Sequence, residues 1–301
     1  MGDAGVTPGS FGKIDFVIDE YASWVPGPEL RPFVAWATGY RQAGVPPQRH
    51  RGLPSPWLTL IVTLDDPLVI ESHPDPRQPG AAYDTLLGGL HTSPALITHD
   101  GRQSGVQLGL TPLGARRLAG LPAGELAQTD LAATDVLGGF AAELRERVAA
   151  EPTWDGRFGV IGSLLGRRVR GRDTDNGDAI RPEVAYAWRR LRTSHGTVPV
   201  SELAEETGWS ARYLYSRFRA ETGLAPKDAA RVFRFYRARH AIARAVRATS
   251  GAKLADLAAD CGYYDQAHLA RDFRQLAGCP PSQWLAEEFR SFQALPADPG
   301  E

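Results

Sequence analysis

The chain has 301 residues, 43% hydrophobic and 23% charged, which is typical of globular proteins and excludes disordered or fibrous classes. This length predicts about two domains. No apolar run approaches the roughly 18 residues that a membrane span needs, and the polar start MGDAGVTPGS is no secretory signal. Two cysteines are too few for a disulfide framework or a structural zinc site, so we expect a cytoplasmic protein without membrane contact.

Charge is divided unevenly along the chain, although the net charge is −1. Residues 181–290 hold 18 Lys and Arg against 12 Asp and Glu, whereas the remainder holds 16 against 23. A positive excess in one part favours a polyanionic partner for that part. The surplus is modest, and by itself it is equally compatible with no such partner.

Residues 15–112 are predicted to form short strands. Segments rich in apolar and β-branched residues follow one another closely, and turn sequences such as Asp-Asp-Pro and Asp-Gly separate them. The segments are PWLTLIVTL (56–64), PLVIES (67–72), AYDTLLGGL (82–90), PALITHDG (94–101) and SGVQLGLTP (104–112). This spacing predicts a small antiparallel barrel or sandwich.

Helical periodicity begins after the strands, within residues 113–169. One helix is expected over 133–150, with Thr134 or Asp135 as its N-cap, and a second over about 155–169. The first has an apolar stripe that suits either packing against the barrel or a dimer seam, formed by Val136, Leu137, Phe140, Leu144 and Val148. The polar segment 170–180 is predicted to be a linker.

The chain after the linker is predicted to be all helical, and its pattern repeats. SELAEETGW (201–209) matches ADLAADCGY (255–263) at an offset of 54, and the offset becomes 55 past the turn. Each unit reads as short helix, glycine turn, longer helix, glycine stop and proline restart. This is the layout of a helix-turn-helix, whose second helix can enter a major groove. We expect the units at 200–223 and 254–278, a linking helix at 226–246, and a flexible tail at 291–301.

Each second helix combines an apolar seam with a polar face. The seam is Leu214 with Phe218 in one unit and Leu269 with Phe273 in the other, and it anchors the helix to its neighbour. The remaining positions lack acidic residues: Arg212, Tyr215, Ser216 and Arg219 in the first unit, and Gln266, Ala267, Ala270, Arg271 and Arg274 in the second. A polar face is usually only solvated. Two such faces at fixed spacing, joined by an arginine-rich helix, favour DNA contact instead.

The second unit, LADLAADCGYYDQAHLARDFRQLAGCPPSQW, closely resembles the signature of the AraC/XylS family of bacterial transcription regulators. The resemblance covers about 183–290. More loosely, the N-terminal part is similar to the cupin-like sensor domains of some members. Tyr264 and His268 depart from the residues common at their places in the family, and they leave the base preference open.

The resemblance implies that both second helices read the major groove. Carried onto this sequence, the base-reading residues are Arg212, Tyr215, Ser216, Gln266, Ala267, Ala270 and Arg271. Arginine suits guanine, glutamine suits adenine, and alanine suits a thymine methyl. Arg219 and Arg274 lie one turn later and are expected to hold phosphates.

Other features have competing interpretations. Barrel histidines such as His50 and His91 suggest a metal, but no H-x-H spacing occurs and we expect none. Cys261 and Cys279 are expected to be packed structural cysteines rather than redox sensors. Aromatic residues suit either the sensor core, which we favour, or an effector pocket. The pocket candidates are Trp24, Trp36, Tyr40 and Trp57.

The sequence therefore predicts an α+β protein. A cupin-like antiparallel barrel or sandwich with trailing helices forms a sensor or dimerisation domain (1–169, with the barrel at 15–112), and an all-helical DNA-binding domain follows (181–290). We expect no enzymatic activity and no cofactor. Candidate partners are promoter DNA, a small-molecule effector, RNA polymerase if the chain activates, and a second copy of the chain. The alternative is a metal-dependent cupin-type enzyme with a DNA-binding appendage.

Overall fold

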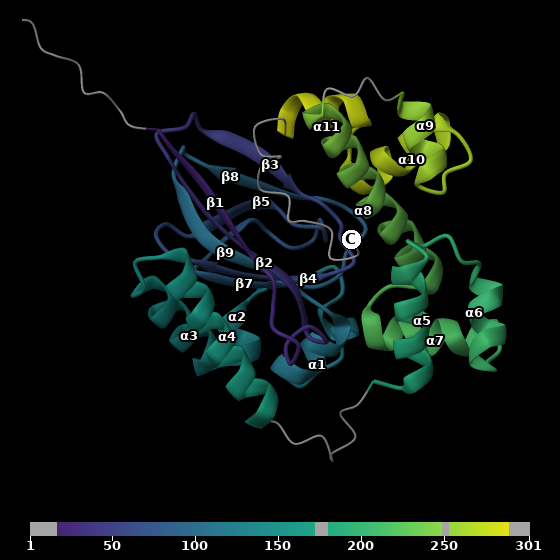
Figure 1. The fold of residues 1–301 in the computed structure, drawn as a ribbon, viewed down its shortest axis with the longest axis horizontal. Helices are drawn as coiled ribbons and strands as arrows, with labels where there is room; N and C mark the ends of the chain where they lie inside the picture. Colours follow the sequence, from purple (N-terminus) through teal and green to yellow (C-terminus); the bar gives the residue numbers. More distant parts are fainter. Residues whose placement is uncertain (1–16, 172–179, 249–252, 289–301) are drawn as a thin grey trace, which may run out of the picture.

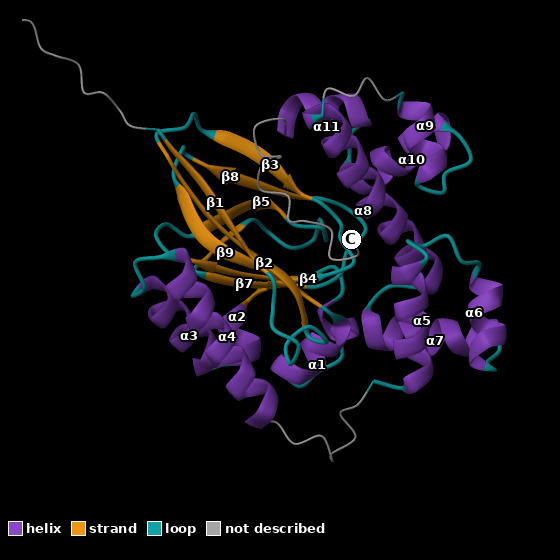
Figure 2. Ribbon diagram, viewed as in Figure 1, coloured by secondary structure: helices purple, strands orange, loops and turns teal. Residues whose placement is uncertain are grey.

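The computed structural model describes residues 17–171, 180–248 and 253–288 (Figure 1). The predicted flexible tail and most of the predicted linker lie outside the described residues. Figure 2 shows that the strands belong to the N-terminal half and that the C-terminal half is helical. The predicted α+β class is confirmed.

Ten strands form two antiparallel sheets in the described N-terminal residues. One sheet has the order β1-β2-β9-β4-β7-β10 and the other β3-β8-β5-β6. Their bounds are β1 Ile18–Trp24, β2 Val34–Ala43, β3 Gln48–Gly52, β4 Leu58–Thr63, β5 Leu68–Ser72, β6 Ala81–Tyr83, β7 Thr85–Gly88, β8 Ala95–His99, β9 Gln103–Leu110 and β10 Asp130–Ala132. All five predicted strand segments contain strands. β10 follows the first helices and pairs with β7, outside the range predicted for strands.

Alternation along the central strands gives the larger sheet two different faces. In β4, Leu58, Leu60 and Val62 belong to the main core, whereas Thr59 and Ile61 line a cavity between the sheets. Successive side chains of a strand point to opposite faces, so one strand serves both. In β9 the same rule puts Val106, Leu108 and Leu110 in the main core and Gln103 and Gln107 at the cavity.

Helices cover the core face of the larger sheet. Their bounds are α1 Pro112–Ala119, the 3-10 helix η1 Ala123–Leu126, α2 Ala133–Leu137, α3 Gly139–Ala149 and α4 Trp154–Gly171. The predicted helix at 133–150 is interrupted at Gly138, whose φ of 61° ends α2. The expected capping by Thr134 or Asp135 is wrong, because Ala132 is the N-cap and makes no side-chain bond. Leu144 and Val148 are buried, and α3 packs on α4, β4 and β7, so packing within the chain accounts for the stripe.

The C-terminal helices form two groups along one long helix, α8 (Figure 1). They are α5 Pro182–Thr193, α6 Val200–Thr207, α7 Ala211–Thr222, α8 Pro226–Arg247, α9 Leu254–Asp260, α10 Gln266–Ala277 and α11 Pro281–Glu288. Gly208 and Gly262 have φ of 69° and 78°, in the left-handed region that glycine adopts without strain. Both predicted turns therefore have the backbone geometry that each helix-turn-helix requires.

Candidate DNA-binding surface and effector cavity

The second helix of the first unit, α7, is named the first reading helix after the role predicted for it, as α10 is named the second. Helix α7 is held by its apolar seam and presents a polar face. Leu214 and Phe218 are fully buried. The side chain of Ser210 caps the helix by accepting from the backbone N–H of Tyr213 at 3.3 Å. The predicted base-reading residues Arg212, Tyr215 and Ser216 are all exposed. These side chains face solvent because Leu214 and Phe218, four residues apart, hold the opposite side of the helix against the core.

The second reading helix, α10, repeats this arrangement. Leu269 and Phe273 are fully buried, and Asp265 caps the helix by accepting from the backbone N–H of His268 at 2.6 Å. Three of the predicted base-reading residues, Gln266, Ala267 and Arg271, are exposed, and Ala270 is half-buried. Tyr264, in the turn before the helix, is 93% exposed and extends the outward surface.

The two predicted phosphate contacts have different surroundings. Arg274 is exposed on α10. Arg219 on α7 donates to the hydroxyl oxygen of Tyr215 at 3.3 Å. Both of these α7 residues line a second cavity, of about 450 Å³, whose other wall includes Asp75 and Arg77 of the strand-rich domain. This end of the first reading helix therefore faces the sensor half of the chain.

The linking helix α8 uses several of its arginines within the protein. Arg231 donates to Asp272 of α10 at 3.0 Å, and Arg234 donates to the carbonyl oxygen of Gly196 at 2.8 Å. Arg239 is 7% exposed, and its guanidinium lies 4.8 Å from the centre of the Tyr236 ring. The arginine content of this helix therefore reflects packing as well as the positive charge that the sequence shows.

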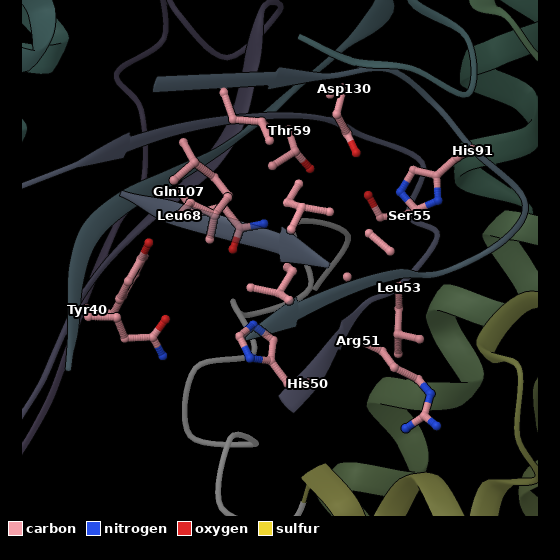
Figure 3. A pocket seen from close by; sticks show the side chains of 18 of the residues that line it. Tyr40, His50, Arg51, Leu53, Ser55, Thr59, Leu68, His91, Gln107 and Asp130 are labelled. Atoms are coloured by element: carbon pink, nitrogen blue, oxygen red, sulfur yellow. The ribbon is translucent and has the colours of Figure 1, made fainter. Parts of the chain in front are cut away.

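A cavity of about 220 Å³ lies between the two sheets and reaches α8 (Figure 3). Thr59, Gln107 and His50 point toward the same space in Figure 3. Its wall is apolar in the middle and polar at several points, the mixture typical of small-molecule sites. The wall includes Tyr21, Trp36, Tyr40, Ile61, Leu68, Ile70, Leu86, His91, Ile97, Gln103, Asp130 and Arg239.

Two of the four aromatic pocket candidates lie at this cavity. Trp36 and Tyr40 line it. Trp24 instead stacks on Phe158 of α4, with ring centroids 6.1 Å apart. Trp57 is buried beside Trp36 in a cluster that also contains Tyr236 of α8.

Other cavity residues were missed from the sequence. Gln103 and Gln107 interrupt an otherwise apolar strand on the face opposite its core residues, and that alternation is a signal that could have revealed them. Asp130 and Arg239 had no such signal, because one lies between the predicted strands and the predicted helix at 133–150 and the other lies on the linking helix.

Burial favours the neutral forms of two histidines and one tyrosine at the cavity. It lowers the pKa of His50 to about 4, with the neighbouring His99 contributing, and it lowers the pKa of His91. It also raises the pKa of the Tyr40 hydroxyl. Asp130, also at this wall, hydrogen-bonds through Oδ2 with Nδ1 of the buried His73 at 2.9 Å.

The described residues contain no cluster of three or more His, Cys, Asp or Glu arranged to hold a metal ion. His50 lies next to His99 with ring centroids 6.1 Å apart, and burial disfavours the charged form of His50. Cys261 and Cys279 are both buried, and they form no disulfide with each other. None of the helices described is long and apolar enough to cross a membrane.

Two family models match parts of the chain. Residues 203–287 match a helix-turn-helix domain, and residues 22–132 match a domain of unknown function, DUF6597. No curated protein matches the sequence. Sequence comparison therefore describes the C-terminal half in functional terms and the strand-rich half only as a recurring domain.

Solved structures share the fold. An apo form of a ToxT variant from Vibrio cholerae is 11% identical with a TM-score of 0.50, covering 88% of this chain and 99% of that one. ToxT of Vibrio cholerae bound to an unsaturated fatty acid is 9% identical with a TM-score of 0.44, and the match covers 80% of this chain and 94% of that one. The AraC-like transcriptional activator CuxR is 15% identical with a TM-score of 0.32, and the match covers 70% of this chain and 78% of that one. The first likeness shows the same succession of strand-rich and helical domains.

The matched domain and the two capped reading helices on one linking helix define a DNA-binding transcription regulator. Residues 203–287 are matched as a helix-turn-helix domain, and it is within this part of the chain that the sequence resembles the AraC/XylS signature.

Proposed function

We propose that the chain binds promoter DNA through α7 and α10 and that a small-molecule effector in the cavity between the sheets controls this binding. The sensor part is residues 1–169, the linker 170–180 and the DNA-binding part 181–290. We place the activity in the cytoplasm, where promoter DNA lies. We propose the same contacts as the sequence predicts. The base-reading residues are Arg212, Tyr215, Ser216, Gln266, Ala267, Ala270 and Arg271, and the phosphate-holding residues are Arg219 and Arg274.

The shared wall of the cavity carries this proposal. Arg239 belongs to α8, yet it lines the cavity of the strand-rich domain. One turn before it, Tyr236 is buried with Trp36, which lines the same cavity, and with Trp57. A ligand with different affinities for two positions of α8 would shift the population between them. Because α8 joins the two helix-turn-helix units, such a shift changes how α7 and α10 meet DNA.

RNA polymerase is a further partner where the regulator activates transcription, and a second copy of the chain remains a candidate partner.

The exposed ring of Tyr213 lies on α7 beside the proposed base-reading face. It packs against Trp209, and the guanidinium of Arg217 lies over it. We assign it no partner.

DNA binding is tested by selecting duplexes from a random pool with the full chain and measuring their affinity by fluorescence anisotropy. We expect one enriched sequence, bound more tightly than an unrelated duplex by about 10³-fold or more. Equal affinity for selected and unrelated duplexes would contradict sequence-specific regulation.

Effector binding is tested by a thermal-shift screen of small molecules against the wild type and two variants. Gln107→Trp fills the cavity, whereas Val69→Trp places the same side chain at a position that is 42% exposed and does not line it. Compounds that stabilise the wild type and Val69→Trp, but not Gln107→Trp, and that also change DNA affinity are the expected result. Compounds that change DNA affinity equally in all three proteins would place the effector site elsewhere.

A further inference from the structure

The sensor half contacts the C-terminal end of the first reading helix, α7, through a buried ion pair. Arg116 of α1 and Glu221 of α7 form a two-pronged contact, in which Nη2 donates to Oε2 at 2.7 Å and Nε donates to Oε1. The side chains are only 16% and 11% exposed. Planar, paired bonds of this kind are the strong form of the Arg–carboxylate interaction, so this contact fixes the orientation of one domain on the other.

The same two segments also touch backbone to backbone. A Cβ at Gly124 of η1 would collide with the carbonyl oxygen of Ala220 on α7. A Cβ at Gly223, whose φ is 89°, would lie 2.8 Å from Cβ of Ala127. Glycine on each side permits an approach that any other residue would prevent. The η1 segment and the end of α7 are therefore fitted to each other.

This contact lies beside residues proposed to meet DNA. Arg219 directly precedes Ala220, and with Tyr215 it lines the cavity shared with Asp75 and Arg77 of the sensor half. A DNA backbone held by Arg219 needs room on that side of α7, and the ion pair of Asp75 with Arg77 stands across the cavity from it. DNA and the sensor domain thus compete for this end of the helix.

The wall of the effector cavity also contacts η1. Gly89 lines the cavity, and a Cβ on it would collide with the carbonyl oxygen of Leu126, the last residue of η1. The backbone N–H of Gly89 also donates to the carbonyl oxygen of Thr129, three residues beyond η1, at 2.9 Å. A ligand that displaces the wall at Gly89 therefore moves η1 against α7.

We propose that α1 and η1 form an intramolecular clamp, which holds the first reading helix away from promoter DNA and is released through the cavity wall at Gly89. The clamp rests on the proposed function, since it requires α7 to bind DNA. Its partner is the Ala220–Gly223 end of α7 in the same chain. Opening it costs the buried Arg116–Glu221 pair, and this cost lowers the DNA affinity of the intact protein.

The experiment is a charge reversal in the full-length chain, with affinity for the selected duplex measured by fluorescence anisotropy. We expect Arg116→Glu to raise affinity about fivefold or more, the range of ordinary coupling free energies. The double variant Arg116→Glu with Glu221→Arg restores the pair and returns affinity to the wild-type value. Arg145→Glu is the control, because its partner Asp84 lies within the sensor half, and it leaves affinity unchanged.

Circular dichroism and thermal unfolding establish that each variant folds, and Gly124→Ala supplies a second opening of the clamp that involves no charge. Unchanged affinity in both folded variants, Arg116→Glu and Gly124→Ala, would overturn the clamp, as would a double variant that stays as tight as Arg116→Glu. A wild-type chain that binds no selected duplex would overturn the proposed function instead, so the two failures are distinguishable.

Discussion

The ring of Phe235 on α8 meets the ring of Phe273 on α10 edge to face, with centroids 4.8 Å apart. Trp284 of α11 packs on Phe273 from another side at 5.6 Å. All three side chains are buried. Because they come from three helices, this contact sets where the second reading helix sits on the linking helix.

Replacing Phe273 by alanine tests how much the second unit depends on this packing. Loss of a fully buried phenylalanine costs about 3–5 kcal/mol, from lost apolar burial and the cavity that remains. We expect the C-terminal half to unfold at lower urea, as measured by circular dichroism and tryptophan fluorescence. Tyr264→Ala is the control, since its side chain is 93% exposed and surface changes stay within about 0.5 kcal/mol. Equal losses for the two variants would refute the role given to this core.

Arg271 is expected to read a base. Arg271→Ala should weaken binding to the selected duplex by about 1–3 kcal/mol and relax the preference at one base pair, because arginine bonds guanine through two acceptors. Competition against duplexes altered one pair at a time measures both effects. An equal loss on unrelated DNA would instead make Arg271 a phosphate contact. Arg167→Ala, an exposed change on α4, is the matched control and should leave binding unchanged.

Local patterns made the DNA-binding half readable from the sequence. The glycine turn and the apolar seam repeat within short windows, so Gly208, Gly262, Leu214 and Leu269 were placed correctly. The strands were readable because their β-branched runs alternate with turn residues. These are short-range signals that survive without knowledge of the tertiary fold.

Long-range relationships were not readable. Nothing local distinguishes Arg239 from the other arginines of α8, and its place at the cavity depends on strands that lie far away in the sequence. Asp130 belongs to a strand of three residues, too short to show a period. Arg116 and Glu221 are 105 residues apart, and each alone looks like an ordinary solvated charge.

Arg274 is expected to hold a phosphate. Arg274→Ala should weaken binding to all duplexes alike, since phosphate contacts carry no base identity. The dependence of log K on log salt should become shallower by about 1, because one fewer counterion-displacing contact remains. Titrations at several salt concentrations measure the slope. A loss confined to the selected duplex would assign Arg274 to base reading.

Cys261 is expected to be unreactive in the folded protein. Burial raises the pKa of its thiol, and the thiolate is the reactive form. Alkylation of a Cys279→Ser variant, followed by mass spectrometry, should be much slower in buffer than in urea. The alkylation rate of the folded variant should also begin to increase only at a pH above that at which the rate of a free cysteine increases. Native alkylation as fast as that of free cysteine would revive a redox-sensing role.

Residues 181–290 alone should bind the selected duplex. The aromatic core of this part is internal: Trp188 packs on Phe218 and Phe233, and Phe235 packs on Phe273. The fragment lacks Arg116, so the clamp cannot form, and it should bind at least as tightly as the intact chain. Anisotropy at ~50 mM salt, where phosphate contacts are strong, is the measurement. A folded fragment that binds no DNA under these conditions would show that the sensor half is required for DNA binding and does not oppose it.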